Sequence, residues 1–369
     1  MGKWFAEDKI KWKETVVNGI ENAPKAFIGI FKSENFVRFC WIVLIVAGSY
    51  MVEGRSPKEA KQVPIAVQKA SRLSQTAKNI RSENQSENCA THWFKNNTRE
   101  KTKGVALVIH GLNLRPDKMQ TIISVLAESG IDVLRLSLRG HGQNYTHRAD
   151  MNEEQARLEA FKAVSFPLWS NEAYLAYTQV REAAIQKKVP LFFVGFSLGG
   201  LIGLDLFASQ PEVHYNRMIL FAPAIKLHSL HYLGRILSPM SRLVIPSMAP
   251  DSYLSNKKGT PVAAYNALFE GLKHFEKHVS RRLNVPTLIF IDEDDEFIPV
   301  QAFKKLKKEK KLDQWRLYIV KKEAAANRDS FHHHIIDESS TGKNVWRKMM
   351  KTLVTHLFAN KPIELNIRI

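Results

Sequence analysis

The chain has 369 residues, of which 44% are hydrophobic, and it carries a formal net charge of +18. It is long and apolar enough for a substantial core, in one large α/β domain with appendages or in two smaller domains. The basic charge suits an anionic partner such as membrane phospholipid or nucleic acid. We expect no nucleic-acid partner, because the chain lacks an aromatic-interleaved RNA-binding pattern, zinc-finger spacing and basic heptads. Cys40 lies in an apolar run, so a disulfide framework with Cys89 is not expected.

The first 52 residues form a segment of their own. An amphipathic stretch of mixed charge leads into Phe39–Val52, a run without a charged residue. This run is shorter than the roughly 20 residues that span a bilayer, and its length fits the apolar region of a signal peptide. The long segment before it argues against cleavage. We therefore expect an N-terminal anchor or signal-like run that associates the protein with a membrane, exported or periplasmic. A buried element of a cytoplasmic protein is the alternative.

A polar linker separates this segment from the main domain. Residues 53–88 are rich in Lys, Gln, Ser and Asn and show little apolar periodicity. The main domain is expected at 89–360, beginning with a short strand in ATHWFKNN, and residues 361–369 form a C-terminal tail.

From Lys103 onwards, apolar strand patterns alternate with helical patterns, which predicts an α/β fold with a mostly parallel sheet flanked by helices. Residues 224–283 interrupt the alternation with apolar and basic stretches, and they predict an inserted helical cap. The expected elements, in chain order, are strand Val105–Ile109, helix Met119–Leu126, strand Ile131–Leu138, helix Glu172–Gln186, strand Leu191–Phe196, helix Leu198–Ser209, strand Arg217–Ala222, strand Pro286–Ile291, helix Val300–Lys311, strand Trp315–Val320 and helix Asn344–Phe358.

The stretch Val189–Gly203 carries the strongest chemical signal. A run of β-formers ends at Gly195-Phe196-Ser197-Leu198-Gly199 and gives way to a helical segment. This strand, sharp turn and helix is the pattern of a nucleophilic serine, whose glycine neighbours leave room for the turn. The N-terminal end of the helix would also stabilise negative charge that develops beside Ser197.

Serine needs a general base and a carboxylate that orients the base. The acidic run 292–296 follows the strand Pro286–Ile291, and we choose Asp295 because it lies four residues before Pro299, which leads into the next helix, with Asp292 and Asp294 in reserve. The run lacks the glycine and the distal glutamate of a calcium loop. Three histidines follow the last strand, and we favour His333 as base, with His332 next.

The same histidines argue against a metal site. Consecutive side chains in a loop diverge, so His332, His333 and His334 would not reach one ion, and the chain has no HExxH pattern. The turn RGHG at 139–142 is also too short for a phosphate loop. We expect no cofactor and no metal.

A further turn, His110-Gly111-Leu112, ends the first clear strand with a small residue. The amides of Leu112 and Leu198 are the expected oxyanion hole. We expect structural, hydrogen-bonding roles for His110 and for His141.

Several motifs together resemble a known family. HGL at 110–112, LRGHG at 138–142, GFSLGG at 195–200, a D-x-x-I-P turn at 295–299 and a late histidine are similar to the α/β-hydrolase superfamily. Within it they most resemble the monoacylglycerol lipase, lysophospholipase and serine aminopeptidase-like branch. The resemblance covers about Ala90–Ala359 and implies a triad of Ser197, Asp295 and His333, with oxyanion amides at Leu112 and Leu198. In that branch the acid turn usually has a glycine where this chain has Asp292.

The resemblance implies a serine hydrolase that cleaves carboxylic esters through an acyl-enzyme. With the apolar cap and the basic surface, it implies a small acyl ester or lipid as substrate, such as lysophospholipid or monoacylglycerol. A peptidase or amidase on the same triad is the enzymatic alternative. A membrane-tethered binding protein without turnover is the alternative from another class. The sequence indicates no oligomeric state.

Overall fold

The computed structural model describes residues 90–98, 100–247, 249–324 and 331–359. They belong to the compact unit Cys89–Ile369, and the chain's other unit, Met1–Asn88, lies outside the described residues. The expected anchor, the linker 53–88 and the tail 361–369 therefore also lie outside them. In the part that the structure describes, no helix combines the length and the apolar character needed to cross a bilayer.

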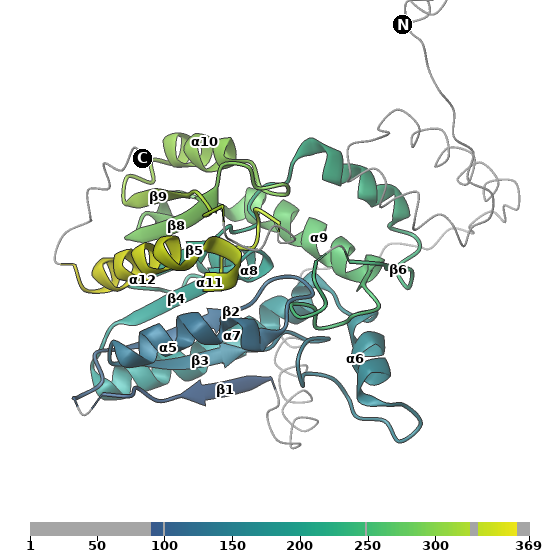
Figure 1. Ribbon diagram of the computed structural model, residues 1–369, viewed down its shortest axis with the longest axis horizontal. Coiled ribbons are helices and arrows are strands. Elements are labelled where there is room, and N and C mark those ends of the chain that lie inside the picture. The colour runs from purple at the N-terminus through teal and green to yellow at the C-terminus, as the bar shows by residue number, and fades with distance from the viewer. Residues whose placement is uncertain (1–89, 99, 248, 325–330, 360–369) are drawn as a thin grey trace, which may run out of the picture. The chain divides into compact units, whose positions relative to one another are not determined.

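A seven-stranded sheet forms the centre of this unit (Figure 1). All neighbouring strands run parallel except the edge pair of β1 and β3, which is antiparallel. The expectation of a mostly parallel sheet flanked by helices is thus confirmed. In sheet order the strands are β1 (Thr91–Phe94), β3 (Ile131–Leu136), β2 (Gly104–Ile109), β4 (Leu191–Phe196), β5 (Arg217–Phe221), β8 (Thr287–Asp292) and β9 (Trp315–Val320).

The central strands are apolar on both faces because helices cover both. Along β2, Val105, Leu107 and Ile109 enter one core, whereas Ala106 and Val108 enter the other. All five side chains are fully buried. This is expected of a strand whose successive side chains point to opposite faces of a sheet that is covered on both faces.

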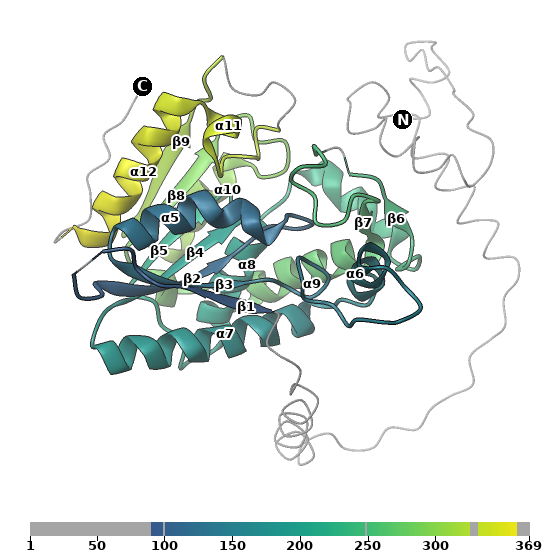
Figure 2. The ribbon, with the colours of Figure 1, turned by 60° about the horizontal axis from the view of Figure 1, so that its bottom comes forward.

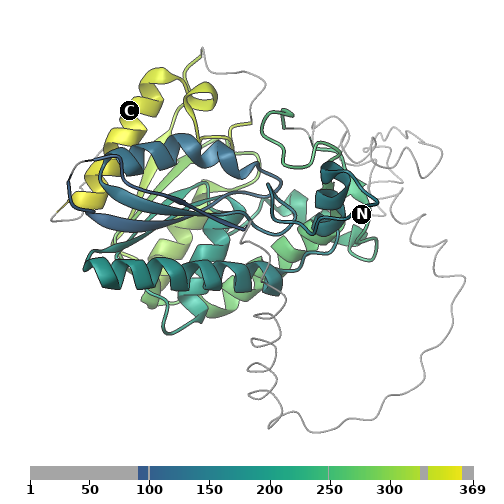
Figure 3. The same cartoon turned by 90° about the horizontal axis from the view of Figure 1, so that it is seen from below.

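Two helical layers cover the sheet (Figure 3). On one face lie α5 (Gln120–Glu128), preceded by the 3₁₀ turn η2 (Pro116–Met119), and α12 (Lys343–Phe358), preceded by α11 (Glu338–Thr341). On the other lie α7 (Phe166–Lys187), α8 (Leu198–Ser209) and α10 (Val300–Lys310).

One helix starts earlier than its sequence pattern predicts. Helix α7 begins at Phe166, six residues before the expected Glu172. Pro167 suggests a helix breaker, but a proline is tolerated in the first turn, where its missing N–H has no intrahelical acceptor. The Ser165 hydroxyl accepts a hydrogen bond from the Leu168 amide at 3.4 Å and caps the helix.

The segments between β5 and β8 occupy the stretch in which we expect the cap. They are the 3₁₀ segment η3 (Ser229–Leu237), β6 (Val244–Ile245), β7 (Thr260–Pro261), α9 (Val262–His278) and the 3₁₀ turn η4 (Arg281–Leu283). Strands β6 and β7 pair antiparallel, and Figure 2 shows them with α9 beside α6 (Glu153–Phe161).

Helix α6 is absent from the sequence prediction. Its start carries a capping box, in which Asn152 accepts from the Gln155 amide and the Gln155 side chain accepts from the Asn152 amide. That pattern is readable in the sequence and was the available signal.

Candidate active site

Ser197 lies on the sharp turn between β4 and α8. Its backbone has φ 50° and ψ −115°, a conformation that costs an L-residue about 1–3 kcal/mol. The surroundings hold the turn in place, since the Ser197 amide donates to the Phe221 carbonyl at 2.9 Å and the Ser197 carbonyl accepts from the Ala224 amide at 3.0 Å. The turn presents the hydroxyl beyond the end of the strand.

The Ser197 hydroxyl meets His333. The distance from Ser197 Oγ to His333 Nε2 is 2.8 Å, although the two residues are 136 positions apart. The imidazole lies between Phe196 and Phe297, with ring centroids 5.1 and 5.2 Å away. These two aromatic rings limit the orientations that the imidazole can adopt.

Asp295 orients the other side of the same imidazole. His333 Nδ1 donates to Asp295 Oδ2 at 2.8 Å, and Asp295 Oδ1 accepts from the amides of Phe297 and Ile298 at 2.9 and 2.8 Å. Burial by itself would raise the pKa of Asp295, but the charge of His333 and these hydrogen bonds hold that pKa below its ordinary value. The carboxylate therefore stays ionised and keeps the Nε2 lone pair directed at Ser197.

The reserve residues lie elsewhere in the same loops. His332 contacts Asp292 instead, with Nδ1 3.1 Å from Oδ2, and its side chain is 45% exposed. His334 is buried and stacks on Tyr253 at a centroid distance of 5.0 Å. Burial, reinforced by the nearby His333, lowers the pKa of His334 to about 3. Asp294 is exposed. Among these candidate aspartates and histidines, only Asp295 and His333 are hydrogen-bonded in series to Ser197.

Glu296 supports this arrangement, and the sequence did not single it out. Its two carboxylate oxygens accept from the backbone amides of His332 at 2.9 Å and of His333 at 3.1 Å. The residue next to Asp295 therefore fixes the backbone that carries His333. Its partners lie 36 and 37 positions away, so no local pattern indicates the contact.

The expected oxyanion turn packs directly against the serine. A Cβ at Gly111 would lie 2.7 Å from the Phe196 ring and 3.3 Å from Ser197 Cβ, so only glycine permits this approach. Leu112 follows Gly111, and Leu198 is the first residue of α8, where backbone amides have no intrahelical acceptor. Both amides that we expect to bind an oxyanion thus belong to segments that contact the sharp turn at Ser197.

Two buried histidines fix the shape of this turn. His110 Nε2 accepts from the Leu138 amide at 3.0 Å while Nδ1 donates to the Gly111 carbonyl at 2.8 Å. His141 Nε2 accepts from the Asn113 amide at 3.0 Å. Burial lowers the pKa of His110 to about 4 and that of His141 well below its ordinary value. Both rings are neutral cross-links between the loops after β2 and β3.

The same turn is hydrogen-bonded to the cap segment. The Asn113 side chain accepts from the Asn256 amide at 2.8 Å and donates to the Asn256 carbonyl at 3.1 Å. The Asn256 side chain donates to the Gly140 carbonyl at 2.9 Å. A shift of the cap at Asn256 would therefore move the backbone beside Leu112.

A second supporting carboxylate, Glu172, also escaped sequence reasoning. It accepts from the Arg139 amide at 2.8 Å and from the Asn144 side chain at 2.9 Å, and so braces the loop that carries His141. Burial raises the pKa of Glu172 to about 7. Its position in an amphipathic helix gave no signal that it faces a loop.

Two clusters among the described residues bring together three side chains that could ligate a metal. One is Asp292, Asp294 and His332, two members of which are exposed. The other, which we name the α8–α9 cluster, is Asp205, His274 and His278.

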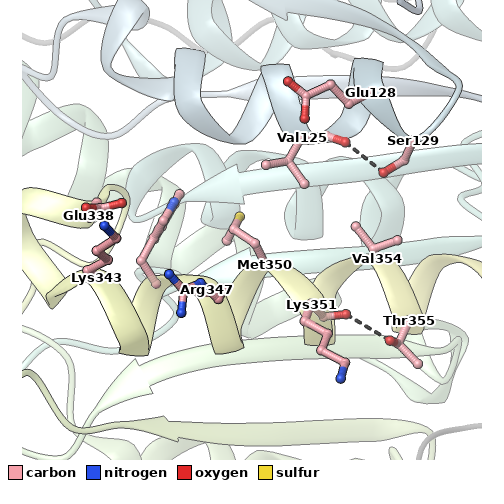
Figure 4. A pocket seen from close by; sticks show the side chains of 11 residues that line it. Val125, Glu128, Ser129, Glu338, Lys343, Arg347, Met350, Lys351, Val354 and Thr355 are labelled. Carbon is pink, nitrogen blue, oxygen red and sulfur yellow. Dashed lines mark hydrogen bonds between the residues drawn. The ribbon is translucent and has the colours of Figure 1, made fainter. Parts of the chain in front are cut away.

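An open groove of about 590 Å³ lies between α5 and α12 (Figure 4). Its lining mixes apolar side chains such as Met350 with charged ones such as Lys343 and Glu128. Ser197, His333 and Asp295 do not line this groove. We therefore place the chemistry at the hydrogen-bonded Ser197.

The connected chain from Ser197 to Asp295 can perform nucleophilic chemistry. His333 Nε2 can accept the proton of the Ser197 hydroxyl as the oxygen attacks an electrophilic carbon, and Asp295 stabilises the resulting imidazolium. Donors at the start of α8 can stabilise the negative charge that forms on the substrate oxygen.

Solved structures share this fold. A soluble variant of monoglyceride lipase from Saccharomyces cerevisiae, in complex with a substrate analog, has a TM-score of 0.57 and 16% identity, covering 73% of this chain and 90% of that one. One of the metagenome-derived lipolytic enzymes described as LipS and LipT has a TM-score of 0.55 and 18% identity, and the match covers 73% of this chain and 98% of that one. Monoacylglycerol lipase of Paleococcus ferrophilus has a TM-score of 0.51 and 17% identity, and the match covers 72% of this chain and 98% of that one. At these identities the likeness shows the fold.

A match to a curated protein is short. NADPH-dependent curcumin reductase of Escherichia coli (strain K12) is 48% identical over 48 residues, and the match spans 13% of this chain and 13% of that protein. A similarity of this length carries no argument about activity.

The family match is much longer. The model described as serine aminopeptidase, S33, matches residues 100–322, which include Ser197 and Asp295 and end before His333. The histidine is thus assigned by its contacts with the other two. Because the match covers more than half of the sequence, and the fold agrees with it, this chain belongs to the serine aminopeptidase S33 family of α/β hydrolases.

Proposed function

We propose that this hydrolase cleaves carboxylic esters of small lipids, such as lysophospholipid or monoacylglycerol, through an acyl-enzyme on Ser197. His333 is the general base, Asp295 orients it, and the amides of Leu112 and Leu198 form the oxyanion hole. The observation that carries the proposal is the unbroken chain from Ser197 Oγ through both nitrogens of His333 to Asp295, with 2.8 Å at each step.

The apolar surface of the cap supports a lipid substrate. None of the nine residues of η3 is fully buried, although the segment includes Leu230, Leu233 and Leu237. Ile236 is 47% exposed. Apolar side chains exposed on a segment of the cap are suited to an acyl chain.

The cap is also hydrogen-bonded to the acid turn. His228 Nε2 donates to the Asp295 carbonyl at 3.1 Å, and His231 Nε2 donates to the Glu296 carbonyl at 2.9 Å. An acyl chain held by η3 would therefore lie next to the turn that carries the acid.

A fluorophosphonate probe tests the role of Ser197. The purified protein should be labelled and should hydrolyse p-nitrophenyl acyl esters, with turnover rising from short to longer acyl chains. Ser197→Ala should lose labelling and at least about 10⁴-fold in kcat. Full labelling of Ser197→Ala would refute the assignment, and a silent probe without turnover at any chain length would favour a binding protein.

The family description itself favours a second candidate, a peptidase acting on N-terminal amino acids. The two activities share the triad and differ in leaving group. Aminoacyl p-nitroanilides, compared with acyl esters on the same preparation, separate them: a higher kcat/KM for the amides would replace the ester proposal.

We also propose that the N-terminal segment associates the protein with membranes. The uncharged run Phe39–Val52 and the net charge of +18 support this. Alkaline carbonate extraction of membranes that contain the full-length chain is the test, and release of the protein into the supernatant would contradict an anchor.

A further inference from the structure

Three metal-ligating side chains meet where the cap helix α9 packs on α8. Asp205 comes from α8, and His274 and His278 come from α9. Each residue places one donor atom within 4.8 Å of the donor atoms of the other two. None of them takes part in the Ser197 chain.

The two histidines lie one helical turn apart. Residues at i and i+4 share a helix face, and this is the spacing at which paired histidines bind zinc on a helix. Their ring centroids are 4.1 Å apart. His278 Nδ1 donates to the His274 carbonyl at 2.8 Å, which fixes the tautomer and leaves the Nε2 lone pair as a ligand atom. A backbone carbonyl commonly holds metal-binding histidines in this way.

Asp205 supplies a negative charge that its partners only half satisfy. Its side chain is fully buried, and Oδ1 lies 2.7 Å from His274 Nδ1. Oδ2 is also buried and has no hydrogen-bond partner among the described residues. A carboxylate oxygen left in this way is unfavourable, and a cation would compensate it.

An ordinary ion pair explains only part of this cluster. A pair of Asp205 and His274 needs one imidazole and would leave both Oδ2 and the orientation of His278 unexplained. A bound cation accounts for all three residues.

We propose that Asp205, His274 and His278 form a binding site for a divalent transition-metal ion of the zinc class. Two imidazoles and one carboxylate are ligands that zinc prefers, and water can complete the coordination. A tetrahedral ion with bonds of about 2.1 Å spaces its ligands by about 3.4 Å, which rotation of the surface histidines can reach. The His274 side chain is 42% exposed, so the ion enters from solvent.

Binding needs the other tautomer of His274. The Nδ1 atom that now donates to Asp205 becomes a ligand atom, and the single proton of the neutral ring is then carried by Nε2. The ion links the cap helix α9 to α8, the helix that follows Ser197, and it stabilises their packing.

Titration of the full-length protein with zinc, followed by calorimetry, tests the site, with cobalt as a spectroscopic probe. We expect one equivalent to bind. At a zinc concentration about 100 times Kd, the Tm should rise by about 5 °C. Cobalt should show the intense visible absorption of a tetrahedral site.

Variants locate the ion. His278→Ala removes one ligand and keeps the Asp205–His274 contact, and Asp205→Asn keeps an acceptor for His274 but removes the charge. Each should weaken zinc binding at least about tenfold. His147→Ala, an exposed histidine outside both clusters, and His332→Ala, from the other cluster, should bind zinc like the wild type.

The proposal is overturned if the wild type shows no zinc-dependent rise in Tm, or if Asp205→Asn and His278→Ala bind zinc unchanged. Loss of the single equivalent in His332→Ala would assign the ion to the Asp292 cluster instead. If His278→Ala fails to fold, Asp205→Asn decides the question.

Discussion

Three consecutive histidines differ in what each ring contacts. His332 meets Asp292 and solvent, His333 connects Asp295 to Ser197, and His334 stacks on Tyr253. The three side chains are identical, and only their positions give them different contacts, because a loop turns successive side chains in different directions.

Substitution of the first two histidines should therefore have unequal effects. We expect His333→Ala to lower kcat on an acyl ester by at least about 10⁴-fold, because the serine loses its base. His332→Ala, which leaves the backbone contact with Glu296 intact, should lower it less than about tenfold. Equal losses in steady-state assays would contradict the assignment of the base.

Glu172 gives a pH-dependent term in stability. Because burial raises its folded pKa to about 7 from an ordinary 4.5, the folded state binds more protons than the unfolded state between these values. The contribution of Glu172 is fully present below pH 4.5 and is lost as pH rises to about 7.

We expect this loss to amount to about 2 kcal/mol, allowing for the part of the side chain that water reaches. Urea unfolding at pH 5 and pH 7.5 measures it. Glu172→Gln, which cannot titrate, should show a smaller difference between the two pH values by that amount. The same difference in both proteins would mean that another group is responsible.

At the scale of single residues, the sequence indicated the candidate catalytic side chains but not the carboxylates that hydrogen-bond to the surrounding loops. Ser197, Asp295 and His333 were chosen from their order and their place after strands, and the structure brings these three side chains together. Glu172 and Glu296 could not be predicted, because both act on backbone amides more than 30 positions away. Which loops approach one another depends on packing, and no local pattern records it.

Among the elements, α8 is packed against backbone on both sides of its first turn. A Cβ at Gly199 would collide with the carbonyl oxygens of Ile109 and His110, and one at Gly200 would lie 2.6 Å from Pro223 Cβ. The glycines after the serine therefore set how closely α8 approaches β2.

Gly199→Ala should destabilise the protein by about 3 kcal/mol, since backbone atoms have no room to move aside. Ser209→Ala at the other end of α8 is the matched control, because the buried Ser209 hydroxyl has no hydrogen-bond partner among the described residues. We expect that change to be within about 0.5 kcal/mol of neutral. Free energies of unfolding in urea measure both, and a neutral Gly199→Ala would contradict the packing argument.

Element boundaries were predictable where β-formers or apolar residues form an unbroken run. Strands β4 and β9 and helix α8 match their expected bounds, although only β4 is buried along its whole length and β9 is partly exposed. The early start of α7 and the whole of α6 were missed, since both depend on capping side chains, Ser165 directly before a Phe-Pro pair and Asn152 in a polar stretch.

For the molecule as a whole, the residues from Cys89 onwards form one of two units and contain every residue of the proposed site. A chain that begins at Cys89 should therefore keep kcat/KM on a water-soluble acyl ester within about twofold of the full-length protein. Its co-sedimentation with anionic vesicles should fall, because the proposed membrane segment is gone. Loss of turnover in the folded, shortened chain would show that the first 88 residues contribute to catalysis.

The hydrogen bonds from the backbone amides of His332 and His333 to Glu296 also affect how the sequence can vary. The turn of Asp295 and Glu296 is joined there to His333 by hydrogen bonds, so the relative position of Asp295 and His333 does not depend on the length of chain that connects them. Insertions or deletions between Glu323 and Phe331 should accumulate in homologues at little cost to activity. A loss of Glu296 should make the same segment intolerant of changes in length.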